Sequence, residues 1–148
     1  MRNCASAVFG EPNIENAVLI GPLMLVGIPQ AAKLPSRAFK PHEGRYSAIK
    51  VLAVVTGSSD VSVTVPAGQR DWVSLLYDPT ARATRNGFLF SAGDPRATFK
   101  TCPGGEPQYN GGFIATKPGC VRLDVENRTS SASGWISLGA DPCPTDGK

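Results

Sequence analysis

Residues 61–79, VSVTVPAGQRDWVSLLYDP, decide the fold class of this chain. In residues 61–65 valine alternates with serine or threonine, and this period of two places the valines on one face of a half-buried strand. Pro66 interrupts the strand, because proline has no N–H to donate to a ladder. A second extended run follows over residues 71–77. We expect the two runs to form an antiparallel pair near the centre of an all-β domain.

Short apolar or alternating runs recur along the chain. It contains 16 Gly and 13 Pro and is 18% charged, which suits many strands joined by tight turns better than long helices. We expect strands in residues 17–28 (one with a bulge, or two short ones), 49–55, 61–65, 71–77, 87–91, 97–102, 113–116, 120–126 and 134–138. This pattern predicts one domain over residues 1–148, a two-sheet antiparallel β-sandwich of immunoglobulin-like or jelly-roll type, cross-linked by disulfides.

The connections differ in length and character. Residues 1–16 are polar and are expected to lie across the surface as an N-terminal segment. Residues 29–46 form a long basic connection with at most one helical turn, and residues 103–112 form a second, glycine-rich loop. Long loops on a rigid scaffold often carry function, so both are candidate contact surfaces.

Four cysteines, Cys4, Cys102, Cys120 and Cys143, indicate two disulfides, because their number is even and no Cys-x-x-Cys pair is present. If residues 120–126 and 134–138 form a hairpin, Cys120 lies near Cys143 and Cys4 is left for Cys102. The rival pairing joins Cys102 to Cys120 across the glycine-rich loop. Either pairing predicts an oxidising, extracytoplasmic location, secreted or anchored at the cell surface.

Composition limits the classes of partner. The net charge is +3 and the basic residues are scattered, which argues against nucleic acid. The most apolar run, residues 17–28, contains a proline and is shorter than the ~20 residues that a membrane span needs. One histidine and no Asp-x-Asp-x-Asp-Gly spacing leave no basis for a metal or cofactor.

Catalytic motifs are also missing from the sequence. It has no Gly-x-Ser-x-Gly elbow and no His-Glu-x-x-His helix, so no catalytic residue is assigned. The alternative is a carbohydrate-active or other hydrolase, which would use Asp78, Asp124 or His42.

Aromatic side chains with polar neighbours are the clearest candidates for binding a glycan or a partner protein. The candidate ligand-binding residues are Trp72, Tyr77, Tyr109, Trp135 and Arg122. Two of these rings are expected in the core, and Trp135 has an alternative role in covering Arg122 by a cation–π contact. We therefore expect a non-enzymatic binding or scaffold domain. A further alternative is a structural subunit of a surface assembly, with an apolar patch or free edge strand within residues 17–28.

Several phrases of the sequence together resemble a known group of proteins: IKVLAVVTG (49–57), VTVPAGQRDWVSLLYDP (63–79), FKTC (99–102), GGFIA (111–115), GCVRLDV (119–125) and SLGADPC (137–143). They are similar to uncharacterised secreted or membrane-anchored β domains of high-GC Gram-positive bacteria. The resemblance covers about residues 45–143 and implies an extracytoplasmic all-β domain with no assigned activity and no functional residues to carry over.

Overall fold

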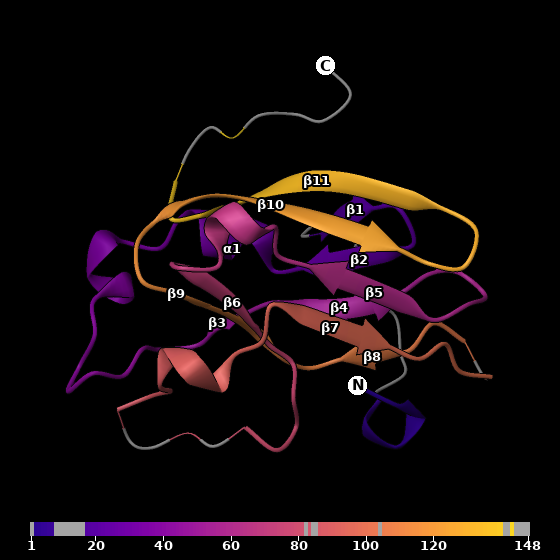
Figure 1. Ribbon diagram of the computed structural model, residues 1–148, viewed down its shortest axis with the longest axis horizontal. Helices are drawn as coiled ribbons and strands as arrows, with labels where there is room; N and C mark the ends of the chain where they lie inside the picture. Colours follow the sequence, from indigo (N-terminus) through magenta and orange to yellow (C-terminus); the bar gives the residue numbers. More distant parts are fainter. Residues whose placement is uncertain are drawn as a thin grey trace.

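The structure is a computed structural model that describes residues 2–7, 17–81, 83, 86–103, 105–140 and 143. Within this part the chain is mostly β, as expected, with little helix (Figure 1). The helical elements are α1 (Ile28–Ala32), η1 (Cys4–Ser6), η3 (Ser36–Phe39), η4 (Ala67–Gln69) and η5 (Phe90–Ala92). The eleven strands are β1 (Ala17–Ile20), β2 (Leu23–Val26), β3 (Ile49–Lys50), β4 (Leu52–Val55), β5 (Val61–Thr64), β6 (Val73–Leu76), β7 (Arg96–Phe99), β8 (Gln108–Tyr109), β9 (Gly112–Ala115), β10 (Gly119–Glu126) and β11 (Ser131–Leu138).

The strands form three antiparallel sheets, with orders β1-β2-β4-β8, β11-β10-β5-β7 and β3-β9-β6. The first and third sheets are linked through the chain itself. Val51 alone separates β3 from β4, and Asn110 and Gly111 separate β8 from β9. The Val51 N–H donates to the Gly111 carbonyl at 3.0 Å, so hydrogen bonding continues across both breaks.

The expected antiparallel pair of residues 61–65 and 71–77 is wrong, although both strands are present. β5 pairs with β10 and β7, whereas β6 pairs with β9 in a different sheet. Pro66 ends the ladder of β5, and η4 then turns the chain away before β6 begins. The interruption therefore moves the chain from one sheet to another instead of closing a hairpin.

Two other expectations about strands have different outcomes. Residues 17–28 form two short strands, β1 and β2, joined by a turn in which Gly21 has a φ of 54°. Residues 87–91 do not form a strand, which corrects the prediction. Phe88 exchanges two backbone hydrogen bonds with Tyr46, and η5 begins at Phe90. Gly87 has a φ of 109°, so the backbone is not extended just before the bridge at Phe88.

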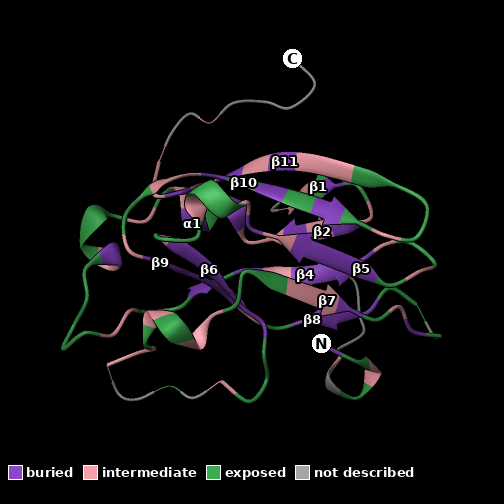
Figure 2. Ribbon diagram, in the orientation of Figure 1, coloured by how far each residue is buried: buried purple, intermediate pink, exposed green. Residues whose placement is uncertain are grey.

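The core is one apolar cluster to which both larger sheets contribute (Figure 2). Its aromatic part joins elements that are distant in sequence. The Tyr77 ring meets Phe99 edge to face at 5.1 Å between centroids, and Phe99 lies 5.3 Å from Tyr109. Phe113 lies 6.3 Å from Tyr77. These rings fix β6, β7, β8 and β9 around one centre.

The two disulfides join Cys4 to Cys102 and Cys120 to Cys143, which confirms the first pairing and overturns the rival one. Disulfides persist in oxidising compartments, so they favour an extracytoplasmic environment. In the described part of the chain, no helix has the length and apolar character needed to cross a bilayer.

The N-terminal segment enters the core at Arg2, which is 6% exposed. Its guanidinium donates to the Tyr77 carbonyl at 2.9 Å and to the Asn110 carbonyl at 2.5 Å, and lies over the Tyr109 ring. Burial lowers the pKa of Arg2, and the two tyrosines and Asp78 oppose that shift. The residues of the expected surface segment at positions 8–16 lie outside the described residues.

Candidate functional site

The outer face of the β11-β10-β5-β7 sheet is built by the strict alternation of β10. Side chains at every second position are buried, and those between them are exposed: Val121, Leu123 and Val125 point inward and Arg122, Asp124 and Glu126 outward. This confirms the alternation expected for residues 120–126. A period of two assigns each outward residue a direct neighbour on the next strand.

The first row of neighbours crosses all four strands at Asp124. Asp124 faces Ser133 on β11 and Thr64 on β5, and Thr64 faces Arg96 on β7. The Ser133 hydroxyl donates to the Asp124 carboxylate at 2.7 Å. This hydrogen bond fixes the carboxylate on the face of the sheet.

A second row lies two residues further along each strand, at Glu126. Glu126 faces Ser131 on β11 and Ser62 on β5, and Ser62 faces Thr98 on β7. The Ser62 and Thr98 hydroxyls are 2.9 Å apart and share a hydrogen bond. The two rows together place hydroxyl and carboxylate groups in a regular lattice.

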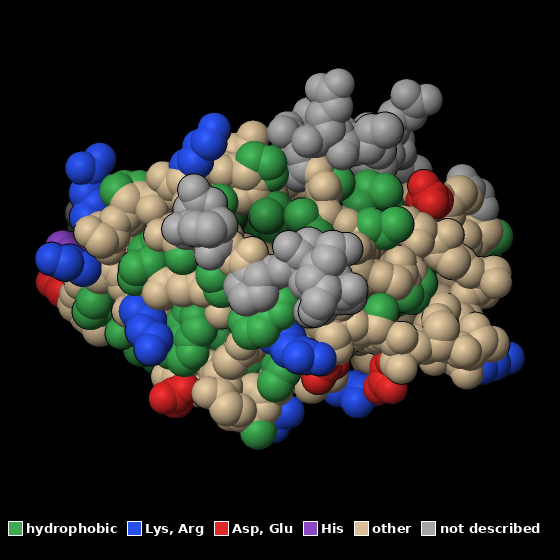
Figure 3. Space-filling model, turned by 90° about the horizontal axis from the view of Figure 1, so that it is seen from above, with side chains coloured by type: hydrophobic (Ala, Val, Ile, Leu, Met, Phe, Trp, Pro, Cys, Tyr) green, Lys and Arg blue, Asp and Glu red, His purple; other side chains and the backbone are tan. Residues whose placement is uncertain are grey.

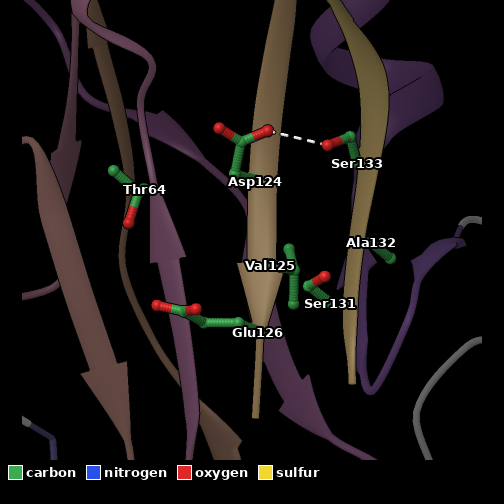
Figure 4. A pocket seen from close by; sticks show the side chains of 7 residues that line it. All are labelled: Thr64, Asp124, Val125, Glu126, Ser131, Ala132 and Ser133. Carbon is green, nitrogen blue, oxygen red and sulfur yellow. Dashed lines mark hydrogen bonds between the residues drawn. The ribbon is translucent and has the colours of Figure 1, made fainter.

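A depression of about 490 Å³ lies over these rows (Figure 4). We call it the polar groove, and it is lined by Thr64, Asp124, Val125, Glu126, Ser131, Ala132 and Ser133. In Figure 4 the Asp124 carboxylate and the Ser133 hydroxyl point toward one another, while the Glu126 side chain extends toward β5. The volume lies within the roughly 300–1,000 Å³ that small-molecule sites occupy.

The charges in and beside the polar groove balance. Arg96 lies 3.4 Å from Glu126, and the Arg122 Nε lies 3.7 Å from Asp124. All four side chains are about half exposed, so each pair contributes only ~0–1 kcal/mol to stability. Two cations and two anions give no net charge, and both kinds of side chain retain exposed surface for a ligand.

Trp135 and Arg122 stand side by side at one end of these rows, as the register of β10 and β11 requires. Trp135 is half-buried and follows Ser133 by two residues on the same face. The Gln69 amide holds the backbone here, because its nitrogen donates to the Arg122 carbonyl at 2.8 Å and its oxygen accepts from the Arg122 N–H at 3.0 Å. If the register of β5 continued, Pro66 would lie opposite Arg122, and proline has no N–H to donate to the Arg122 carbonyl. The Gln69 side chain supplies that donor instead.

The other three candidate aromatic residues lie elsewhere. Trp72 is half-buried beside the β9–β10 turn, with the Lys117 ammonium 5.1 Å from its ring centroid. Tyr77 and Tyr109 are 3% and 0% exposed, and their hydroxyls donate to the Val51 and Lys100 carbonyls. These two are core rings without a free face for stacking. Burial raises the pKa of both tyrosines, and Arg2 partly offsets that shift.

The residues considered for hydrolysis belong to separate elements. Asp124 lies on β10, Asp78 follows β6, and His42 lies in an exposed turn with Arg45 before β3. The pKa of Asp78 is lowered because the backbone N–H and then the hydroxyl of Thr80 donate to its carboxylate. Among the residues that the structure describes, no three metal-binding side chains form a cluster.

Sequence reasoning named Trp135 and Arg122, which lie beside the groove, and Asp124, which lines it, but it named no other groove residue as a candidate. Asp124 and Glu126 were readable as outward residues from the alternation in β10. Thr64 and Arg96 were not, because they join the groove only through pairing with a distant strand. Comparison of the chain with protein-family models, curated proteins and solved structures gave no match.

Proposed function

We propose that this protein is a non-enzymatic, extracytoplasmic β-sandwich module that binds a glycan across the polar groove and Trp135. In this interpretation the β1-β2-β4-β8 and β11-β10-β5-β7 sheets are the two layers, and the apolar cluster that they share is the hydrophobic core. The observation that carries the proposal is the lattice of hydroxyls and balanced charges on an open sheet face beside a tryptophan.

The chemistry of the groove matches that of a sugar. Each sugar hydroxyl donates and accepts hydrogen bonds, and the groove offers carboxylate acceptors at Asp124 and Glu126 and hydroxyls at Ser131 and Ser133. Trp135 lies on the same face, where its ring can lie against the apolar face of a pyranose. Because the local charges cancel, a neutral glycan suits the groove better than a charged one.

The test is binding of neutral oligosaccharides to the wild type and to a matched pair of tryptophan variants. We expect Trp135→Ala to weaken binding roughly tenfold, about 1.4 kcal/mol. Trp72→Ala removes a half-buried tryptophan from outside the groove and is expected to leave affinity within twofold. Asp124→Asn preserves shape and is expected to weaken binding as well, because a carboxylate accepts stronger hydrogen bonds than an amide oxygen.

Three results would count against this proposal. The first is no binding of any neutral glycan at millimolar concentration. The second is equal loss of affinity in both tryptophan variants. The third is release of new reducing ends from the glycan, abolished in Asp124→Asn, because that result would favour the hydrolase.

A second candidate, a subunit of a surface assembly, is favoured by β1. In the described residues β1 pairs with β2 alone, and Leu19 on it is 63% exposed. An apolar residue on an edge strand is a common site of strand-to-strand association. Sedimentation of the wild type and of Leu19→Lys checks this: concentration-dependent association lost in the variant supports assembly, and a monomer at all concentrations rejects it.

A further inference from the structure

The connection between β2 and β3, together with Lys50 of β3, concentrates the positive charge of the protein. Residues 29–50 hold five cations and one carboxylate, a net charge of +4, whereas the whole chain has a net charge of +3. The remaining residues, with ten cations and eleven carboxylates, sum to −1. The basic residues are scattered along the sequence, but their excess over the acidic residues comes from residues 29–50. We call Lys33, Arg37, Lys40 and Arg45 the basic connection.

The basic connection is held firmly by a few buried residues. Phe39 is 2% exposed and lies against Gly139, where an added Cβ would come within 2.5 Å of its ring. The Gly139 N–H donates to the Ala31 carbonyl at 2.8 Å, which ties α1 to the end of β11. These anchors fix the backbone while Lys33 and Arg37 remain exposed.

The far end of the basic connection is a tight turn that projects into solvent. His42 and Arg45 exchange two backbone hydrogen bonds, and Glu43 and Gly44 between them have φ values of 52° and 78°. No atom lies within 4 Å of a Cβ placed on Gly44. In Figure 3 the histidine side chain lies at the left end of the molecule beside Lys and Arg side chains, with hydrophobic side chains nearby.

The cations of the basic connection have no acidic partner within the described part of the chain. The two ion pairs among the described residues involve Arg96 of β7 and Arg122 of β10, which lie outside the basic connection. Glu43, the one carboxylate among residues 29–50, accepts a hydrogen bond from Asn86 at 2.6 Å. The positive field of these side chains is therefore directed to solvent and to any anionic partner.

We infer that the basic connection is a second binding surface, which takes a linear anionic polysaccharide. Several unpaired cations on a fixed backbone match a polymer that carries carboxylate or sulfate groups at intervals. A bilayer is less suitable, because Leu34 and Ala38 are half-buried and Phe39 is buried, so residues 28–46 offer no large exposed apolar side chain for insertion. Nucleic acid is less suitable, because Phe39 is buried and Tyr46 is half-buried, so that His42 alone in this segment presents an exposed ring for base stacking.

This surface is separate from the polar groove. In Figure 1 the segment between α1 and β3 forms the left end of the molecule, whereas the end of β10 and the start of β11, which line the groove, lie to the right. The inference goes beyond the proposed function, since it depends on net positive charge, whereas the charges in and beside the polar groove cancel. Loss of either site is therefore expected to leave the other intact.

The test compares two triple variants with identical changes in charge. Lys33→Gln, Arg37→Gln and Lys40→Gln are combined in one protein, and Lys100→Gln, Lys117→Gln and Arg128→Gln in the control; all six residues are exposed. Affinity for dextran sulfate and for uncharged dextran is measured at 50 and 200 mM NaCl. We expect the wild type to bind dextran sulfate only, and roughly 20-fold more weakly at the higher salt if three charges are neutralised.

The first triple variant is expected to lose at least tenfold in affinity for dextran sulfate at 50 mM NaCl, and the control less than threefold. Trp135→Ala is expected to bind dextran sulfate like the wild type, which separates this result from the glycan proposal. Equal losses in the two triple variants would overturn the inference, because net charge alone would then explain binding. Tighter binding to double-stranded DNA or to vesicles of phosphatidylserine and phosphatidylcholine would also overturn it.

Discussion

β10 and β11 are consecutive strands, and they pair with each other as a hairpin. β5 and β6 are also consecutive, but they pair with other strands. β10 and β11 are joined by a short turn in which the side-chain Oδ1 of Asn127 accepts from the backbone N–H groups of Thr129 and Ser130. Between β5 and β6, Pro66 and η4 break the ladder and redirect the chain. In this chain the turn that satisfies its own hydrogen bonds closes a hairpin, whereas the proline that lacks a donor ends the ladder of β5.

The two regions also differ in what holds them. The hairpin depends on contacts between residues close in sequence. β5 and β6 depend on partners that the rest of the chain must deliver: β10 and β7 for β5, and β9 for β6. The following experiments separate local from long-range stabilisation, starting with the largest expected effect.

Removing the long-range disulfide should cost the most. Cys4 and Cys102 are separated by 98 residues, and closing a loop of about that length contributes about 4.7 kcal/mol in the loop-entropy model. The Cys4→Ser, Cys102→Ser double variant is therefore expected to lose stability of that order, measured by urea unfolding. The Cys120–Cys143 disulfide spans 23 residues, so its removal should cost less, about 3.4 kcal/mol. An equal or reversed order would show that loop length does not govern these contributions.

Adding a methyl group at one glycine of the hairpin and at one glycine of β9, the partner of β6, compares a contact to a side chain with a contact to backbone. A Cβ on Gly112, in β9, would lie within 1.9 Å of the Ile49 carbonyl oxygen, which is backbone and cannot move independently. A Cβ on Gly134, in β11, would meet the flexible Ile20 side chain at 2.7 Å. We expect Gly112→Ala to cost ~3 kcal/mol or more and Gly134→Ala roughly 1 kcal/mol in thermal or urea unfolding. Similar losses would contradict the distinction between backbone and side-chain contacts.

Tyr77 connects β6 to Val51 and should make stability dependent on alkaline pH. Burial raises its pKa, so above the ordinary tyrosine value of about 10 the unfolded chain releases a proton that the folded chain retains. Its contribution is complete below pH ~10 and falls by about 1.4 kcal/mol per pH unit above it.

Tyr77→Phe is the control for that pH dependence. It should lose ~1–3 kcal/mol near neutral pH, because the Val51 carbonyl loses the donor that lies 2.7 Å away. Above pH 10 its stability, measured by urea unfolding across the pH range, should fall less steeply than that of the wild type. Parallel pH profiles for the two proteins would exclude Tyr77 as the responsible group.

The smallest effect is expected at Gln69, which repairs the ladder where Pro66 interrupts it. Gln69→Ala removes two hydrogen bonds to the Arg122 backbone, and because this site is exposed to water the cost should be ~1 kcal/mol. Hydrogen exchange of the Arg122 amide should accelerate at the same time. Unchanged exchange at Arg122 would show that water replaces the Gln69 amide fully.

Features that depend on residues close together in the sequence were predicted more successfully than features that depend on residues far apart in it. The inward and outward faces of β10 and the Cys120–Cys143 pairing were predicted from neighbouring residues, and the two short strands β1 and β2 were one of two alternatives predicted for residues 17–28. The strand expected at residues 87–91 is wrong: within the described part of the chain, Phe88 forms an isolated bridge with Tyr46 and residues 87–91 belong to no sheet. In and beside the candidate site, Trp135, Arg122 and Asp124 were named from the sequence, whereas Thr64 and Arg96 required the long-range register.

By itself the sequence determined the all-β class, the oxidised cysteines and the side chains that face outward on the most regular strands. These follow from alternation and composition, which are properties of short segments. Only the tertiary structure decided which strands meet, that Arg2 enters the core, and that Asp124 lies between Ser133 and Thr64. The reason is that strand pairing is a choice among many ladders with similar local hydrogen bonds, and only the packing of the whole core selects one of them.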